Sequence, residues 1–186
     1  PRKLVLQSSS KSREYDGTIL TEEEYAVSEG SLADGQSERV TFNASLQNVG
    51  SMQNSFAAVI YASDGVTDVT SNYDLECLYG TLEVTPRPLK ITTQSGNKVY
   101  DGTALTNAGY EITAGDVAAE QRIDVQTMGT QTTVGQSANT VAVTITDVAG
   151  EEVTSNYDLT LVTGVLEITP RKLVLQSSSK SREYDG

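Results

Sequence analysis

The sequence predicts an all-β protein: two tandem small antiparallel β-sandwich domains of the immunoglobulin-like kind, arranged in an extended rod. Three observations support this fold class. Strand-favouring Val, Thr, Ile and Tyr are plentiful, while Gly and Ser punctuate the chain and Trp is absent. The chain contains an internal repeat. The apolar positions that both copies of the repeat share alternate along the chain with a period of two.

The repeat is visible in short phrases that recur about 85 residues apart. Tyr-Asp-Gly occurs at 15–17, 100–102 and 184–186. The phrase TSNYDL occurs at 70–75 and 154–159, and a variant of LYGTLEVTPRPLKI follows it each time. A unit of this length is too long for a solenoid repeat and long enough to bury a core of its own. We therefore predict separate domains.

The first seventeen residues, PRKLVLQSSSKSREYDG, return unchanged as residues 170–186. This higher-order period predicts that a parent protein repeats the pair of domains in tandem, and the start at Pro1 indicates a fragment. The predicted parts are a first repeat domain (1–86), a second repeat domain (87–170) and the first strand of a truncated third repeat (171–186). We expect this strand to fray, to lean on the preceding domain or to pair with a neighbouring molecule's sheet edge.

Within each repeat, the shared apolar positions predict half-buried strands, because alternate side chains of a strand face the same side. Val5 matches Lys90, so this position can face water. The apolar matches are Leu4 and Leu6 with Leu89 and Ile91; Val40 with Val125; Phe56, Ala58 and Ile60 with Val141, Val143 and Ile145; Leu75 and Cys77 with Leu159 and Leu161; and Leu82 and Val84 with Leu166 and Ile168. We predict six or seven short antiparallel strands per repeat, with Gly-containing turns.

Two alternatives accompany this interpretation. A β-grasp-like fold is the architectural alternative, but it needs a helix, and no segment has a helical period in both copies. Tyr73 and Tyr157 match a tyrosine corner, in which the hydroxyl bonds back to the backbone and the second residue after it, Leu75 or Leu159, points inward. The alternative for these tyrosines is plain packing at a strand edge.

The phrase that joins the repeats, TPRPLK or TPRKLV, leaves almost no linker. Pro86, Pro88 and Pro170 restrict φ and remove ladder donors. The last strand of one domain is therefore expected to run nearly straight into the first strand of the next, which favours a stiff rod.

The charge balance excludes two classes of partner. The chain carries 25 acidic and 13 basic residues, a net charge of −12. Nucleic acid phosphates and anionic lipids both need Lys and Arg, so we expect neither nucleic acid nor anionic membrane as a partner. No apolar run approaches the length of a membrane span, which predicts no membrane insertion of this segment.

Composition also restricts catalysis. The chain has no His and a single Cys, which excludes a Ser-His-Asp triad, a Cys-His dyad and His-metal sites. Cys77 matches Leu161, so we interpret it as a core thiol. Paired carboxylates could catalyse glycoside hydrolysis. The acidic residues of this chain recur in both repeats, however, and catalytic groups seldom repeat along a stalk. The recurring pairs are Asp16 with Asp101, Asp74 with Asp158, and Glu83 with Glu167. We predict no enzyme activity, no catalytic residues and no cofactor, and that the Asp of Tyr-Asp-Gly caps a turn.

Two further chemistries, calcium binding and an isopeptide crosslink, have simpler alternatives. The acidic loops ASDGVTD (62–68) and DVAGEE (147–152) could hold calcium, but their carboxylates differ in position, so solvated turns are favoured and no metal ligand is assigned. A Lys–Asn isopeptide crosslink would need a lysine that keeps its place in both repeats, and none does.

Tyr15, Tyr100 and Tyr184 share the Tyr-Asp-Gly motif. An exposed tyrosine in this place could contact a glycan or a protein. The simpler interpretation, which we favour, is a tyrosine packed at the end of a strand.

Several of these phrases together resemble a known family. The pieces SNYDL, G-x-L-E-[IV]-T-P-R and Y-D-G-T-x-L, followed by V-G and another TSNYDL, are similar to the YDG or MBG domains of bacterial surface proteins of the adhesin type. The resemblance covers both repeats. It implies tandem extracellular β domains that form stalks or adhesive modules, and it assigns no catalytic residue.

The sequence thus predicts an extracellular, bacterial cell-surface location. The leading hypothesis is a structural stalk or spacer that projects a distal binding region, with adjacent repeats of the same chain as partners. The alternative is that the repeats themselves bind a host glycan or surface protein weakly and gain strength through avidity.

Overall fold

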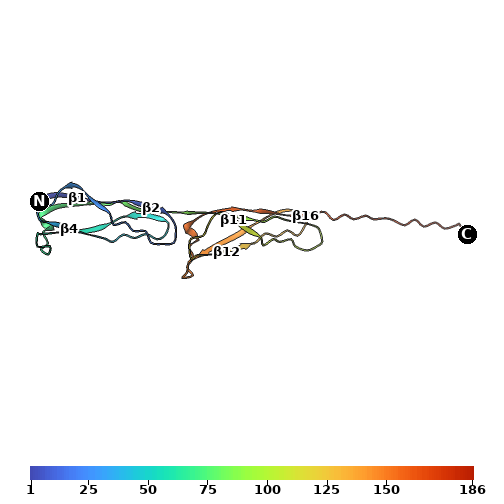
Figure 1. The fold of residues 1–186 in the computed structure, drawn as a ribbon. Coiled ribbons are helices and arrows are strands. Elements are labelled where there is room, and N and C mark those ends of the chain that lie inside the picture. Colours follow the sequence, from blue (N-terminus) through green and yellow to red (C-terminus); the bar gives the residue numbers. More distant parts are fainter. The chain divides into compact units, whose positions relative to one another are not determined.

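The structure is a computed structural model that describes residues 1–186. It consists of sixteen strands and two 3-10 turns, with no α-helix, which confirms the all-β prediction (Figure 1). No helix is present that is long and apolar enough to cross a membrane. The chain divides into two compact units: Pro1–Ile91 with Ile112–Asp124 and Val143–Thr160, and Thr92–Glu111 with Val125–Ala142 and Leu161–Gly186. The first unit therefore contains the whole first repeat and three segments of the second.

The first repeat forms eight strands in three small sheets. The strands are β1 (Arg2–Ser8), β2 (Lys11–Glu14), β3 (Tyr25–Gly30), β4 (Ser37–Phe42), β5 (Gly50–Gln53), β6 (Phe56–Tyr61), β7 (Tyr73–Leu78) and β8 (Thr81–Thr85), and a 3-10 turn (Thr70–Asn72) precedes β7. The sheet orders are β3-β1-β7, β2-β8-β5 and β4-β6. Strand β1 is thus the central strand of its sheet. It lies between β3, which is near it in sequence, and β7, which comes near the end of the repeat.

The second repeat has the corresponding eight strands. They are β9 (Arg87–Thr93), β10 (Gly96–Val99), β11 (Tyr110–Gly115), β12 (Arg122–Thr127), β13 (Gly135–Asn139), β14 (Val141–Thr146), β15 (Tyr157–Val162) and β16 (Gly164–Thr169), with a 3-10 turn (Thr154–Asn156) before β15. The sheet orders are β11-β9-β15, β10-β16-β13 and β12-β14. The two copies of the repeat therefore share one strand order.

The prediction of six or seven antiparallel strands per repeat is too low in strand number, and its strand direction holds for most pairs but not for all. Most pairs are antiparallel, but β1 pairs in parallel with β7, β2 with β8, and β10 with β16. Side chains alternate in the same way in both kinds of ladder, so an alternating pattern does not reveal the direction of the partner strand.

A single hydrophobic core joins the sheet β3-β1-β7 to the sheet β4-β6. Its buried members are Leu4, Leu6, Phe56, Ile60 and Tyr73. The partly buried side chains against them are Tyr25, Leu32, Val40, Phe42, Ala58, Val69, Leu75 and Cys77. The alternating positions expected to face inward therefore do line the core in this part of the first repeat.

The sheet β2-β8-β5 buries a second group of side chains. Leu82 and Val84 on β8 are buried, as predicted, and Leu20 is buried with them. The main chains of Leu20 and Leu46 exchange two hydrogen bonds of 2.7 and 3.0 Å, which hold the loop after β2 in place. Leu166 and Ile168 on β16 are buried in the same way in the second unit.

Lys90 is exposed, so this position does face water in the second repeat, but Val5 at the same position of the first repeat is buried. Only 3% of its surface is exposed. In the sheet register, Val5 lies opposite Glu29 on β3 and Glu76 on β7. Cross-strand partners project on the same face of a sheet, so the stems of these long side chains flank the valine and cover it. Lys3, two residues earlier on β1, pairs with Glu29 at 2.8 Å and adds to this cover.

Asn54 ties three segments of the first repeat together. Its side chain is fully buried, and its Nδ2 donates to the carbonyl oxygens of Ser9 and Glu22 at 3.0 Å each. Its main-chain amide donates to the oxygen of Gly80, and its own oxygen accepts from the hydroxyl of Ser8. Buried main-chain carbonyls need such partners, because an unpaired one loses its bond to water without replacement.

Asn139 makes the same contacts in the second unit. Its Nδ2 donates to the oxygens of Gln94 and Asn107, and its oxygen accepts from the hydroxyl of Thr93. Asn54 and Asn139 occupy matching positions of the two copies. The buried asparagine is therefore a feature of the repeat itself.

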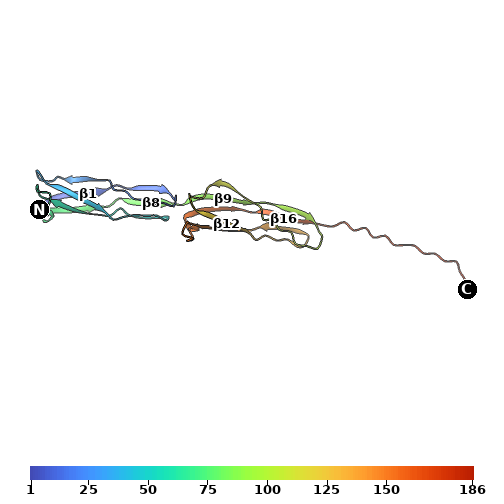
Figure 2. The ribbon, with the colours of Figure 1, turned by 60° about the horizontal axis from the view of Figure 1, so that its bottom comes forward.

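One residue, Pro86, separates β8 from β9, which confirms that the repeats are joined almost without a linker (Figure 2). Proline at this place fixes φ and offers no amide to either ladder. The main chain therefore passes from the last strand of one repeat into the first strand of the next with little freedom.

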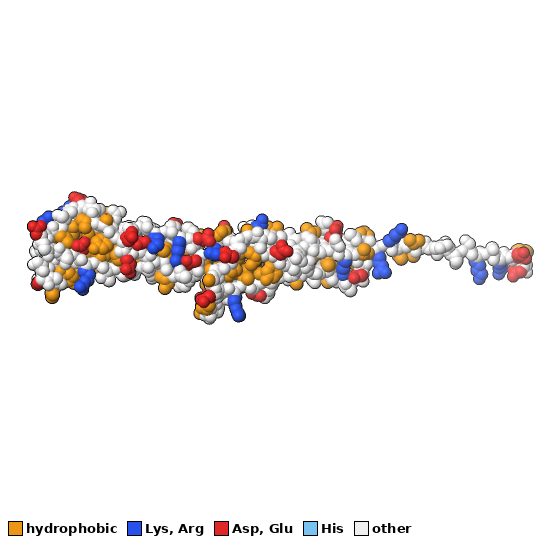
Figure 3. Space-filling view, viewed as in Figure 1, with side chains coloured by type: hydrophobic (Ala, Val, Ile, Leu, Met, Phe, Trp, Pro, Cys, Tyr) orange, Lys and Arg blue, Asp and Glu red, His pale blue; other side chains and the backbone are white.

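Residues 170–186 form no strand. They contain the segment predicted as the first strand of a truncated third repeat, for which fraying was one of the three expected outcomes. Their apolar side chains are exposed: Leu173 at 78%, Leu175 at 86% and Tyr184 at 96% (Figure 3). The identical residues 1–17 form β1 and β2 because β3, β7 and β8 supply the missing hydrogen bonds. A strand without partner strands has no such bonds, so the same sequence stays extended and exposed.

We expect Asn54→Ala to lower the free energy of unfolding by about 2 kcal/mol, because two partly buried carbonyl oxygens lose their donor. Urea unfolding monitored by circular dichroism measures this change. Asn43→Ala, at an exposed position of the same repeat, is the matched control and should change stability by less than about 0.5 kcal/mol. Equal effects of the two substitutions would contradict the role assigned to Asn54.

Candidate functional site at the junction of the repeats

The Tyr-Asp-Gly motif forms a tight corner after β2 and after β10. Asp16 Oδ1 accepts hydrogen bonds from the amide and the hydroxyl of Thr18, at 2.9 and 2.8 Å. Asp101 accepts the same two bonds from Thr103, at 2.9 Å each. Gly17 has a φ of +83°, a conformation that glycine adopts without steric cost. The prediction that the aspartate caps a turn is confirmed.

A basic side chain braces each corner. Arg13 lies 3.1 Å from Asp16 and also donates to the oxygen of Thr18, and Lys98 lies 2.8 Å from Asp101. Burial opposes the ionisation of Asp16, but the Thr18 hydrogen bonds and Arg13 outweigh it and hold the pKa of Asp16 below its usual value. The Lys98 bond and the Thr103 bonds hold the pKa of Asp101 well below its usual range. Both corners therefore carry an ionised aspartate at neutral pH.

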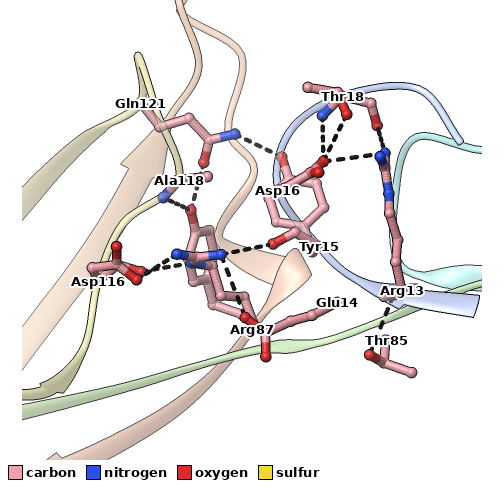
Figure 4. A network of polar contacts seen from close by, with 11 residues as sticks. Arg13, Glu14, Tyr15, Asp16, Thr18, Thr85, Arg87, Asp116, Ala118 and Gln121 are labelled. Atoms are coloured by element: carbon pink, nitrogen blue, oxygen red, sulfur yellow. Dashed lines mark hydrogen bonds and ion pairs between the residues drawn. The ribbon is translucent and has the colours of Figure 1, made fainter.

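Tyr15, the tyrosine of the first corner, packs against the second repeat within the first unit. Its side chain is 1% exposed. Its ring meets the ring of Tyr157 edge to face, with the centroids 5.6 Å apart and the planes at 76°. Gln121 Nε2 donates to the Tyr15 hydroxyl at 2.8 Å (Figure 4). Edge-to-face pairs of this kind stabilise a contact beyond the area that they bury.

Tyr157 is held in turn by its own repeat. The Ala118 amide donates to its hydroxyl at 2.9 Å, and this hydroxyl donates to Gln121 Oε1 at 2.6 Å. Gln121 therefore uses both ends of its amide, one for Tyr157 and one for Tyr15. Burial raises the pKa of the Tyr157 hydroxyl, so the group stays protonated and remains a donor at neutral pH.

Arg87, the residue after Pro86, is the second element of the junction. It forms an ion pair with Asp116, whose main-chain oxygen also accepts from Arg87 Nε at 2.9 Å. Its Nη1 donates to the main-chain oxygen of Tyr15 at 3.3 Å and to Glu14 at 3.4 Å (Figure 4). One planar guanidinium thus binds residues of both repeats through a fixed fork of donors.

Asn156 closes the junction on another side. Its Oδ1 accepts from the Val49 amide at 2.8 Å, and its Nδ2 donates to Asn48 at 3.0 Å. Asn156 is 3% exposed, whereas Asn72, the same residue of the first repeat, is exposed. Burial at this position therefore comes from the preceding repeat.

These contacts define what we call the junction site: Tyr15 and Arg87 with Asp116, Gln121, Asn156 and Tyr157. Its aromatic, charged and amide groups face one another within the first unit, where they tie residues of the first repeat to residues of the second. Beside it lies a cleft of about 530 Å³. The acidic residues that line the cleft are Asp147, Glu151 and Glu152.

The three tyrosines of the Tyr-Asp-Gly motif differ in burial. Tyr15 is packed, as predicted, but Tyr100 is 40% exposed and Tyr184 is 96% exposed. The prediction of a packed strand end is therefore wrong for the second and third copies. A tyrosine at this corner is buried by a neighbouring repeat, and neither Tyr100 nor Tyr184 has that neighbour in the structure.

The predicted tyrosine corners form hydrogen bonds to the backbone, but across a long distance in sequence. The Tyr73 hydroxyl accepts from the Ala33 amide, forty residues upstream, and Tyr157 accepts from Ala118. Leu75 is half-buried and packs against the core, and Leu159 is half-buried. The partner segment is the loop before β4 or β12, which a pattern in sequence does not identify.

The acidic loops that the sequence offers as candidate calcium sites form capped turns. Asp64 accepts from the hydroxyl and the amide of Thr67 and from the amide of Val66. These bonds lower the pKa of Asp64 to about 2. Asp147 accepts from the amides of Ala149 and Glu151. Each of these carboxylates therefore accepts hydrogen bonds from its own loop and caps a turn there.

The predicted core thiol, Cys77, is half-buried and packs against the hydrophobic core of the first repeat. Burial raises the pKa of this thiol above its usual value, so the unreactive protonated form prevails at neutral pH. The remaining carboxylates of the recurring pairs lie on strands. Asp74 and Asp158 are exposed on β7 and β15, and Glu83 on β8 accepts from the Ser12 hydroxyl at 3.1 Å.

Sequence reasoning missed most of the junction site. Arg87 and Gln121 recur as Arg2 and Gln36 at matching positions of the first repeat, and this recurrence was an available signal. Asp116 has no such signal, because Ser31 stands in its place. Asn156 recurs as Asn72 but is buried only in the second repeat, so its role depends on the neighbouring repeat.

No protein-family model matches the chain, and no curated protein matches it as a relative. The resemblance to YDG or MBG domains therefore stays a prediction from the motifs.

We expect Tyr15→Ala to lower the free energy of unfolding by about 3–5 kcal/mol, because a buried aromatic ring and its edge-to-face partner contact are lost. Tyr100→Ala removes the same residue of the same motif at an exposed position and should cost about 1 kcal/mol or less. Chemical denaturation of the two variants measures the difference. If both cost the same, the packing of Tyr15 against the second repeat does not stabilise the chain.

We expect the free energy of unfolding to decrease as the pH falls from 3.8 toward about 2, where the folded-state carboxyl of Asp64 takes up its proton. The pKa of Asp64 is depressed in the folded state, so its stabilisation is present above its ordinary pKa and is lost in this window. Asp64→Asn keeps an oxygen acceptor but does not titrate, and its stability should fall less steeply. Asp34→Asn, at an exposed position, is the control and should retain the wild-type slope.

Proposed function

We propose that this chain is a structural spacer segment of a repetitive bacterial cell-surface adhesin, and that it projects a distal binding region away from the cell. The proposal includes the finer fold assignment, in which residues 1–86 and 87–170 are tandem immunoglobulin-like sandwich domains and 171–186 open a further one. The motif resemblance supplies the location at the cell surface. The structure supplies features that suit a spacer under tension.

The observation that carries the proposal is the parallel pairing of the first two strands of a repeat with its last two strands. Strand β1 pairs with β7 over six residue positions, from Arg2 with Tyr73 to Gln7 with Leu78. Strand β2 pairs with β8 over four positions, from Lys11 with Leu82 to Glu14 with Thr85. A pull on the two ends of a repeat moves such strands past each other, so the hydrogen bonds of both ladders are loaded together.

The junction site supports the same function. A spacer keeps its reach only if its joints resist bending, and flexible linkers lose end-to-end distance. Here one proline joins the strands, Arg87 binds both repeats, and the Tyr15 ring is buried against Tyr157. The acidic net charge of −12 favours solubility and discourages association between neighbouring stalks.

The alternative function, weak binding of a host glycan or surface protein, rests on exposed tyrosines. Tyr79, Tyr100 and Tyr110 are each about 40% exposed. Tyrosines in such positions are common anchors at binding surfaces. A glycan array probed with chains of one, two and four repeats separates the two proposals. Binding that is specific and grows with the number of repeats would replace the spacer function.

Single-molecule force spectroscopy tests the spacer proposal. The full chain with Cys77→Ser is pulled first from its two termini, which loads the β1–β7 ladder in shear. It is then pulled from the N-terminus and a Ser71→Cys attachment point in the exposed turn before β7, which opens the same ladder one bond at a time. We expect a severalfold higher unfolding force for the first repeat in the first geometry. Equal forces in the two geometries would contradict a load-bearing role for the parallel ladder.

A further inference from the structure

The chain contains one sequence in two structural states. Residues 1–17 form β1 and β2, with Leu4 and Leu6 fully buried and Tyr15 at 1% exposure. Residues 170–186 have the identical sequence, yet they form no strand, and Leu173 and Leu175 are about four-fifths exposed. Residues 170–186 could therefore occupy the site of residues 1–17 in the first repeat, because every residue is the same.

That place is specific along its whole length. Strand β1 is hydrogen bonded on both sides, antiparallel to β3 and parallel to β7. Strand β2 continues the contact by pairing in parallel with β8. Leu173 and Leu175 correspond to Leu4 and Leu6, so they carry the side chains that this core requires. A segment that adds both main-chain pairing and core side chains binds as a strand of the sheet.

The chain that leads from β16 into residues 170–186 also resembles the chain that leads from β8 into the second repeat. Pro170 and Arg171 follow Thr169, the last residue of β16, as Pro86 and Arg87 follow Thr85, the last residue of β8. We call residues 170–186 the tail. A tail bound in place of residues 1–17 of another molecule would therefore bring Tyr100 of its own chain to the start of that molecule's first repeat. This is the relation that the Tyr15 corner has to the second repeat within one chain.

The start of the first repeat already has the geometry that receives such a corner. The Ala33 amide donates to the Tyr73 hydroxyl at 2.9 Å, and this hydroxyl donates to Gln36 at 2.6 Å. Ala118, Tyr157 and Gln121 make the same bonds at the same lengths around Tyr15. Arg2 donates to Ser31 at 2.6 Å, as Arg87 does to Asp116 at the junction site.

We propose that residues 170–186 of one chain replace residues 1–17 in a second copy of this chain, so that copies associate head to tail. The seated tail forms β1 and β2 of the acceptor, and Tyr100 of the donor packs against Tyr73 and Gln36 of the acceptor. This inference does not depend on the spacer proposal, because it follows from the identical segments and the matching junction geometry.

The exchange is governed by competition between identical strands. In the intact chain, residues 1–17 are tethered to their own site, and an attached segment has an effective concentration in the millimolar range. The tail of another molecule therefore displaces residues 1–17 only where a substitution weakens their binding, or where chains fold together at high concentration. The contact of Tyr100 with the acceptor is the interaction that the exchange adds.

The first experiment uses variants of the 186-residue chain whose substitutions distinguish the two identical segments. Leu4→Glu with Leu6→Glu weakens the resident strand and leaves the tail intact, and we expect head-to-tail oligomers in analytical ultracentrifugation. Leu173→Glu with Leu175→Glu makes the same change in the tail and should give a monomer with wild-type thermal stability. The chain with all four substitutions should neither assemble nor show the cooperative unfolding of the first repeat.

Two controls make the outcome decisive. A synthetic peptide with the sequence of residues 1–17 should convert the oligomers of Leu4→Glu/Leu6→Glu to monomers by filling the acceptor site. Tyr100→Ala in the same chain should weaken association by roughly tenfold, because an aromatic contact is lost. A Leu4→Glu/Leu6→Glu chain that stays monomeric, folded or not, overturns the proposal, and so does equal association of the four-substitution chain.

A second measurement uses the unmodified chain. When it is unfolded and refolded at increasing concentration, the share of oligomers should rise with concentration, and the Leu173→Glu/Leu175→Glu chain should refold to monomer throughout. Oligomers that form equally in both chains would show that the tail is not the donor strand.

Discussion

The pairing of β1 between β3 and β7 is the interaction on which each repeat depends. It joins the first strand of the repeat to one that begins about seventy residues later, so it closes the fold around the core. It gives the main chain of β1 partners on both sides, and it sets Leu4 and Leu6 opposite the β4-β6 sheet. Loop closure over such a distance costs entropy, which the core and the two ladders offset together.

The direction of that pairing explains how one repeat is attached to the next. Because β1 and β7 are parallel, and β2 and β8 are parallel, the chain enters a repeat at one end of its sheets and leaves at the other. The Tyr-Asp-Gly corner that ends β2 therefore lies beside the end of β8, where the next repeat begins. Tyr15 and Arg87 meet at that point, and the buried asparagine holds the middle of the repeat.

The sequence predicted those features that depend on a residue and its near neighbours. The alternation of Leu82 and Val84 marked a half-buried strand, and Asp16 with Gly17 marked a capped turn. It did not predict the burial of Val5, which depends on Glu29 and Glu76 from two other strands. It also missed the parallel ladders, since side-chain alternation is the same in both strand directions. Gln121 escaped notice because its role needs tyrosines from two repeats at once.

By itself, the sequence determined the repeat, its length, the apolar positions of its strands and the turns that separate them, because local sterics and side-chain alternation act over a few residues. Only the tertiary structure decided whether a given segment becomes a strand. PRKLVLQSSSKSREYDG forms β1 and β2 in one place and no strand in another. The physical reason is that the hydrogen bonds of a strand belong to its neighbours, so a strand forms only where neighbouring strands present their amides and carbonyls.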